Sequence, residues 1–147
     1  MIRIKVFFII PILLLNMLQA GKSNHIASVA KSMLGKRYKW GGNGPYSYDC
    51  SGFTKKVFKI NGIKLPRLSK EQAKVGLKVG KNQLRKGDLL FFSSKNHHQV
   101  NHVGIYLGHG KFIHASRFHH KIVISPFREY KRYFKWGRRV KNRKWRG

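Results

Sequence analysis

The chain has 147 residues, of which 41% are hydrophobic and 13% are aromatic. This length supports one domain and excludes two full hydrophobic cores, and the apolar content excludes a wholly disordered chain. The charge is extreme, with 32 lysines and arginines against 4 acidic residues and a formal net charge of +28. A surface of this kind attracts polyanions at long range.

Residues 1–20 have the pattern of a secretory signal peptide. Arg3 and Lys5 precede an apolar run over residues 6–15, and the small residue Ala20 closes the segment. A positive start, a short apolar stretch and a small residue before the cleavage point are the three parts of such a signal. The alternative is an uncleaved anchor helix, but the apolar run is short for a membrane span of about 20 residues. We therefore expect an exported protein, periplasmic or secreted, without a lipid anchor.

The first half of the remaining chain has helical patterning. Apolar residues at helical spacing, turn residues after them and the capping-box spacing of Ser69 and Gln72 predict three helices, over residues 23–34, 50–60 and about 70–78. The segment over residues 36–49, rich in glycine, is predicted to be a loop.

The second half changes to short apolar runs. These predict strands over residues 88–92, 102–107, 111–116, 121–125 and 136–140. Helices followed by a run of strands indicate an α+β fold, here with N-terminal helices packed on an antiparallel sheet of five or six strands. We assign residues 21–140 to this domain and residues 141–147 to a basic C-terminal tail.

The single cysteine, Cys50, lies where the loop leads into the second predicted helix. Structural cysteines of exported proteins come in pairs, and Cys50 has no second cysteine to pair with. In the first turn of a helix, unpaired N–H groups and the helix dipole lower the pKa of a thiol. The same N–H groups can hold the oxyanion of a tetrahedral intermediate. We interpret Cys50 as a nucleophile; the alternative is a buried, inert cysteine.

Two of the eight histidines, His102 and His114, fall inside predicted strands. A three-residue hairpin loop between these strands would pair Leu107 with Lys111 and Gly104 with His114. The two imidazoles would then share one face of the sheet, at a diagonal backbone separation of about 7–8 Å. A two-residue loop would put them on opposite faces. We interpret His102 as the base for the thiol and His114 as the residue that orients it.

Six stretches of the chain, in this order, resemble the NlpC-type peptidoglycan endopeptidases, which are papain-like cysteine hydrolases of bacterial cell walls. A lone Asp-Cys-Ser-Gly motif is a weak signal, whereas six motifs in the family's order are a strong one. The resemblance covers roughly residues 25–140, and its motifs are residues 38–42, 49–53, 65–67, 86–92, 101–108 and 112–116.

The resemblance implies a papain-like fold and a cysteine peptidase activity. It implies Cys50 as the nucleophile, His102 as the general base, His114 as the third polar residue and Tyr38 beside the nucleophile, near the oxyanion. The reaction it implies is hydrolysis of the amide between γ-linked D-glutamate and the following diamino acid of a peptidoglycan stem peptide.

The resemblance also implies substrate-binding positions. Asp49 and Ser51 match residues that, in some members, bind the free amino end of the stem peptide. Asp49 at a helix start is also a good cap for that helix. We expect no cofactor and no metal, because the histidines at residues 97–98 and 119–120 lack the spacing of a zinc site.

The surplus of positive charge leaves further partners open. Besides stem peptides, we expect anionic wall polymers or lipid head groups as candidates and no nucleic acid, since export argues against it. We expect a monomer. Two alternatives stay open: a related thiol acyltransferase or lipid-directed hydrolase, and a cationic wall-binding protein without enzyme activity.

Overall fold

The structure, a computed structural model, describes Met17 and residues 21–94 and 98–141. The predicted signal peptide, apart from Met17, and the basic tail beyond residue 141 lie outside the described residues. Within the described part of the chain, no helix has the length and apolar character that crossing a membrane requires.

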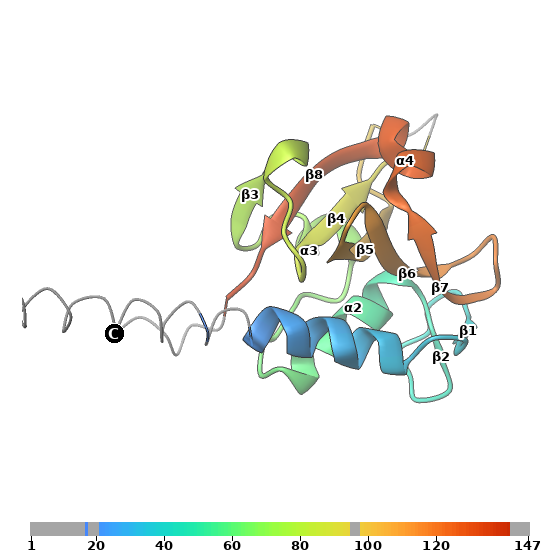
Figure 1. Ribbon diagram of the computed structural model, residues 1–147. Coiled ribbons are helices and arrows are strands. Elements are labelled where there is room, and N and C mark those ends of the chain that lie inside the picture. Colours follow the sequence, from blue (N-terminus) through green and yellow to red (C-terminus); the bar gives the residue numbers. More distant parts are fainter. Residues whose placement is uncertain (1–16, 18–20, 95–97, 142–147) are drawn as a thin grey trace, which may run out of the picture.

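Helices lie on both sides of a curled sheet (Figure 1). The N-terminal helix occupies residues 21–32, close to its predicted bounds, and the second predicted helix is confirmed as α2. The labelled helices are α2 (Cys50–Ile60), α3 (Ser69–Gln72) and α4 (Phe127–Tyr130), with two 3₁₀ turns, η1 (Lys81–Gln83) and η2 (Lys131–Tyr133).

The prediction of a third helix over residues 70–78 is wrong beyond its first turn. Gln72 does not complete a capping box, since its buried side chain hydrogen-bonds instead with Thr54 and with backbone carbonyl groups. Gly76 then turns the chain with a φ of +72°. The following residues form a strand that pairs with the C-terminal strand, so tertiary pairing overrides the local helical preference.

Eight strands form one sheet in the order β2-β1-β7-β6-β5-β4-β8-β3. All the described pairs are antiparallel except β1 with β2. The five predicted strands are confirmed, and three very short ones are added, two of them in the segment predicted to be a loop. Their bounds are β1 (Arg37–Tyr38), β2 (Ser47–Tyr48), β3 (Leu77–Val79), β4 (Leu89–Phe92), β5 (His102–Gly108), β6 (Lys111–Ser116), β7 (Lys121–Pro126) and β8 (Phe134–Arg139).

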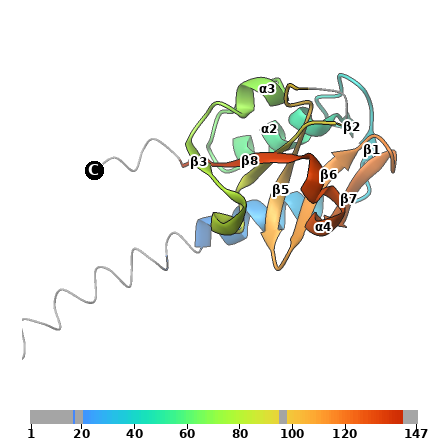
Figure 2. The same cartoon turned by 90° about the horizontal axis from the view of Figure 1, so that it is seen from above.

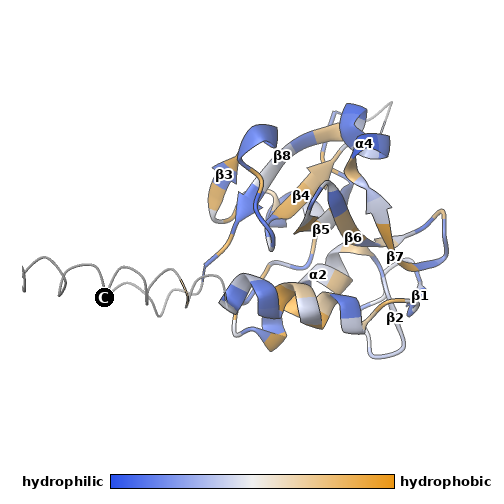
Figure 3. Cartoon of the chain, in the orientation of Figure 1, coloured by the Kyte–Doolittle hydropathy of each residue, from blue (hydrophilic) through white to orange (hydrophobic). Residues whose placement is uncertain are grey.

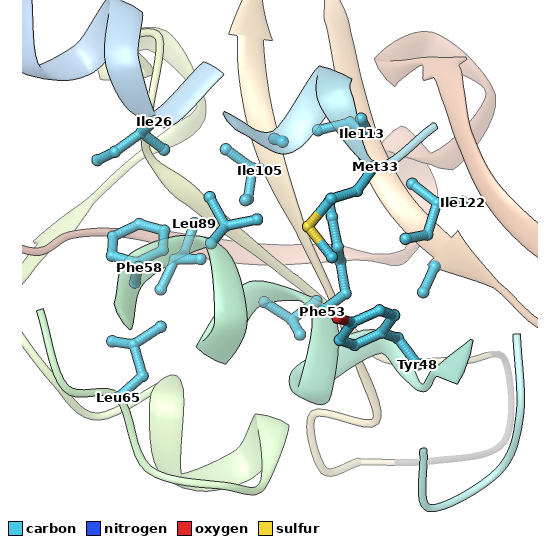
Figure 4. Close-up of a cluster of buried hydrophobic side chains, with 14 of the residues drawn as sticks. Ile26, Met33, Tyr48, Phe53, Phe58, Leu65, Leu89, Ile105, Ile113 and Ile122 are labelled. Atoms are coloured by element: carbon cyan, nitrogen blue, oxygen red, sulfur yellow. The ribbon is translucent and has the colours of Figure 1, made fainter. Parts of the chain in front are cut away.

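The sheet separates two apolar clusters. On one face, residues such as Ile105 and Ile113 pack against Phe53 of α2 and Ile26 of the N-terminal helix (Figure 4). Both helices have alternating polar and apolar bands (Figure 3), as expected for helices with one buried side. The smaller cluster contains four buried residues, namely Leu90, Phe92, Phe112 and Phe127.

The hairpin between β5 and β6 has a different loop from the predicted one. Gly108 pairs with Lys111, so the loop has two residues, His109 and Gly110, with φ values of +52° and +71°. Positive φ at both positions is the requirement of a type I′ turn. The predicted pairing of Leu107 with Lys111 is therefore wrong.

A bulge next to this loop compensates for the loop being one residue shorter than predicted. The register shifts between Tyr106 and Gly108, and further along Ile105 pairs with Ile113. Continuing that register brings Gly104 opposite His114, as predicted. The extra residue of a bulge restores the alternation that a two-residue loop alone would have inverted. Strands β5, β6 and β7 then run side by side (Figure 2).

Candidate active site

His102 and His114 form a hydrogen-bonded pair across β5 and β6. Nε2 of His102 lies 2.8 Å from Nδ1 of His114, with the two rings nearly perpendicular at 79°. His114 is 1% exposed, and its ring stacks on Phe112 at a centroid distance of 4.5 Å. Nε2 of His114 lies 2.9 Å from the hydroxyl oxygen of Ser125 on β7.

Gly104 makes this close pairing possible. A Cβ at this position would lie 2.7 Å from a ring carbon of Phe112 and 3.2 Å from the Cβ of His114. A Cβ at residue 104 would push against Phe112 and His114, and the ring of His114 would have to move. The absence of a side chain at Gly104 therefore leaves the space that the ring of His114 occupies.

Cys50 stands at the first turn of α2, where the helix reaches the start of β5. The backbone N–H groups of Val103, Ser51 and Cys50 itself favour the charged form of its sulfur, and Val103 is the residue next to His102. Nε2 of His102 is engaged with the second histidine, so Nδ1 is the nitrogen left for the thiol. The residues predicted as nucleophile, base and third polar residue thus belong to adjoining parts of one site.

The ionisable groups of this site favour their neutral forms. Burial raises the pKa of Cys50 to about 11, and the charge of Asp49 adds to this, while the backbone hydrogen bonds act in the opposite direction. Burial also lowers the pKa of His102 to about 4. Burial, followed by the nearby His102 and His119, lowers the pKa of His114 to about 2. These directions favour a resting site with a thiol and two uncharged imidazoles. The predicted lowering of the thiol pKa is wrong in direction, because desolvation outweighs the helix terminus.

At pH 7, Cys50 is expected to react with iodoacetamide about tenfold more slowly than glutathione. A pKa of about 11 leaves roughly a hundredth of the thiolate of a free thiol, and the higher nucleophilicity of a basic thiolate recovers part of that loss. The rate should rise about tenfold per pH unit up to pH 10. Intact-mass time courses measure it, and fast alkylation already at pH 6 would indicate a thiolate–imidazolium pair instead.

Asp49 is held by a network that the sequence did not reveal. Its carboxylate accepts the Gly52 N–H at 2.7 Å, which caps α2, and forms a two-pronged ion pair with Arg67 at 2.9 and 2.8 Å. Arg67 also donates to the hydroxyl of Ser51 at 2.9 Å. Arg67 belongs to the family motif at residues 65–67, but no local sequence pattern predicted its contact with Asp49. The structure brings Asp49 and Ser51 together at the start of α2 and adds a guanidinium to them.

Tyr38 on β1 belongs to the same electrostatic environment. Burial raises the pKa of its phenol, and an ionised Cys50 and the charge of Asp49 raise it further, while Arg117 lowers it. A raised pKa keeps the hydroxyl protonated and able to donate a hydrogen bond. The phenol is thus within electrostatic range of Cys50, and its role near the oxyanion stays a prediction.

The histidines considered for a metal site are spread over the fold. His119 hydrogen-bonds with the hydroxyl of Ser116 at 2.9 Å, and His97 lies outside the described residues. Across Met17 and residues 21–94 and 98–141, no group of three or more His, Cys, Asp or Glu side chains is arranged to hold a metal ion.

A helix-borne cysteine next to two hydrogen-bonded strand histidines, on an α+β fold, is the arrangement of papain-like cysteine peptidase domains. The chain belongs to the NlpC/P60 family, whose family model matches residues 35–139. The match spans all the site residues described above.

Curated relatives and a solved structure agree with this assignment. The chain is 49% identical over 86 residues to a probable endopeptidase p60 of Listeria innocua, covering 58% of this chain and 18% of that protein. It is 38% identical over 105 residues to a gamma-D-glutamyl-L-lysine dipeptidyl-peptidase of Bacillus cereus, covering 71% of this chain and 32% of that protein. The NlpC/p60 domain of the peptidoglycan hydrolase SagA has a TM-score of 0.72 and 29% identity, over 80% of this chain and 98% of that one. The chain thus spans less than a third of either curated relative.

Proposed function

We propose that this chain is an exported cysteine endopeptidase that hydrolyses amide bonds in peptidoglycan stem peptides, at the bond between γ-D-glutamate and the following diamino acid. The observation that carries the proposal is the hydrogen-bonded pair of His102 and His114 beside the helix-borne Cys50. The bond specificity is supported by the similarity to a gamma-D-glutamyl-L-lysine dipeptidyl-peptidase. Export is supported by the pattern of residues 1–20.

Acylation begins from the neutral pair. The sulfur of Cys50 attacks the carbonyl carbon of the amide while Nδ1 of His102 takes the thiol proton. The imidazolium then gives this proton to the amine nitrogen as the C–N bond breaks, which leaves a thioester on Cys50. Water attacks the thioester with His102 again as the base, and the proton returns to the sulfur as the acid product leaves.

The oxyanion formed in both steps requires hydrogen-bond donors. The N–H of Gly52 is committed to Asp49 and that of Phe53 to a backbone carbonyl, which leaves the N–H groups of Cys50 and Ser51 at the start of the helix. Both face the sulfur in the resting site, and we assign the N–H of Cys50 to the oxyanion. The phenol of Tyr38, kept protonated by its raised pKa, is the second donor that we assign.

Asp49 and Ser51 are assigned to the free amino end of the stem peptide. Replacing Asp49 with asparagine keeps a helix cap but removes the charge. We expect KM for a stem peptide with a free L-alanine amine to rise about tenfold, as for loss of a partly buried charge-assisted hydrogen bond, with little change for the N-acetylated peptide. The ratio of kcat/KM for the two peptides is the measurement, and an equal loss on both peptides would assign Asp49 to capping α2 and holding Arg67 alone.

Digestion of purified sacculi tests the proposed reaction. Wild-type protein should release fragments that end at γ-D-glutamate, identified by mass spectrometry of the soluble products. Cys50→Ala should release none while still binding the wall. Equal fragment patterns with both proteins, or no cleavage with either, would contradict the proposal; wall binding without cleavage by the wild type would favour a cationic wall-binding protein.

A further inference from the structure

Ser125 extends the pair of histidines by one more buried group. It lies on β7, is 4% exposed, and places its hydroxyl oxygen 2.9 Å from Nε2 of His114. Two aromatic rings also contact that imidazole, with the Phe112 ring stacked on it and the Tyr130 ring edge-on at 5.3 Å. The chain of contacts therefore runs from His102 to His114 and ends at a serine.

The positions of the N–H hydrogens on His102 and His114 depend on each other. Each neutral imidazole carries one N–H, and the contact between Nε2 of His102 and Nδ1 of His114 can hold only one hydrogen. If Nδ1 of His102 is to accept the thiol proton, its hydrogen must be on Nε2 and point at Nδ1 of His114. The hydrogen of His114 is then on Nε2, and the hydroxyl oxygen of Ser125 must accept it.

The opposite direction of the hydrogen bond between Ser125 and His114 would leave His102 unable to accept the thiol proton. A Ser125 hydroxyl that donates to Nε2 of His114 would force the hydrogen of His114 onto Nδ1. That hydrogen would point at Nε2 of His102 and leave the hydrogen of His102 on Nδ1, facing the thiol. The protonated His102 formed during catalysis would also meet a second N–H at this contact instead of a lone pair.

We propose that Ser125 is a positioning residue that accepts a hydrogen bond from His114 and thereby keeps Nδ1 of His102 free to take the thiol proton. This inference rests on the proposed function, in which His102 is the base. No proton moves to or from Ser125. Its role is to accept the Nε2–H of His114 and thereby stabilise the tautomer that keeps a lone pair of His114 directed at the imidazolium that forms on His102.

The tautomers can be measured without any substrate. The ¹⁵N chemical shifts of the ring nitrogens distinguish protonated from unprotonated positions. In the wild type we expect the proton on Nε2 of both His102 and His114, and in Ser125→Ala a mixture of tautomers. A wild-type spectrum with the proton on Nδ1 of His102 would overturn the inference, whatever the enzyme cleaves.

Kinetics supply the second readout. Ser125→Ala should lower kcat about 10- to 100-fold, since it leaves a buried N–H without a partner, and leave KM nearly unchanged; Ser125→Thr should recover most of kcat. Ser116→Ala, which removes another buried hydroxyl that bonds a histidine, is the matched control and should retain wild-type kcat. Wild-type kcat and tautomers in Ser125→Ala would overturn the inference while leaving the proposed function intact. Absence of cleavage by the wild type would overturn the proposed function, and the ring-nitrogen shifts would still report on Ser125.

Discussion

His102→Gln is expected to lower kcat by about 10³-fold, within the range of general acid–base catalysis. The side-chain N–H of glutamine can still donate to Nδ1 of His114, which replaces the hydrogen bond of 2.8 Å from His102. It has no basic nitrogen for the thiol proton, however, and the thiol of Cys50 with its raised pKa does not ionise by itself at neutral pH. The measurement is kcat on a soluble stem peptide.

His25→Gln is the matched control for this substitution. His25 is exposed on the N-terminal helix and hydrogen-bonds with Asn61, which caps the end of α2 opposite to Cys50. Its kcat should equal that of the wild type. If His102→Gln keeps more than about a tenth of the wild-type kcat, His102 is not the base, given the usual size of such a contribution.

Gly52→Ala is expected to lower stability and activity together. A Cβ at this position would lie 2.2 Å from the carbonyl oxygen of Gly42 and 2.9 Å from the carboxylate of Asp49. The same carbonyl accepts hydrogen bonds from Arg67 and from the backbone N–H of Asp49, so it has little freedom to move. The start of α2 must shift instead, and with it the sulfur of Cys50.

We expect Gly52→Ala to lower the free energy of unfolding by about 1–3 kcal/mol, the usual cost of overpacking. We also expect a loss of about 10²-fold in kcat, since a displacement near 1 Å at a reacting group has that effect. Urea unfolding and steady-state kinetics measure the two changes. Gly80→Ala is the control, because the nearest atom to its added Cβ lies 3.8 Å away. Wild-type behaviour of Gly52→Ala would show that α2 tolerates the shift.

The sequence predicted those parts of the fold that have a strong local pattern. Apolar periodicity located the helix that starts at Cys50, and alternating short runs located the strands that carry His102 and His114. Strands of two or three residues, such as β1 and β3, carry no periodicity of their own and exist because neighbouring strands pair with them. They were therefore predicted as a loop and as part of a helix.

The site was predicted less completely than the fold. The common face of His102 and His114 was predicted through an incorrect loop, and a bulge beside Leu107 restored it. Arg67 and Ser125 were missed as partners of site residues because their contacts cross between distant segments. The direction of the thiol pKa was missed for a related reason. Burial is a property of the packed chain, and it outweighs the helix terminus that the sequence makes visible.

Interception of the acyl-enzyme with hydroxylamine is the sharpest test of covalent catalysis by Cys50. Hydroxylamine competes with water for a thioester, so digestion of an L-alanyl-γ-D-glutamyl-diamino acid peptide in its presence should yield the hydroxamate of the released dipeptide. We expect this product with the wild type and neither cleavage nor hydroxamate with Cys50→Ala. Cleavage by Cys50→Ala at the wild-type rate, or wild-type cleavage that never yields hydroxamate, would contradict it.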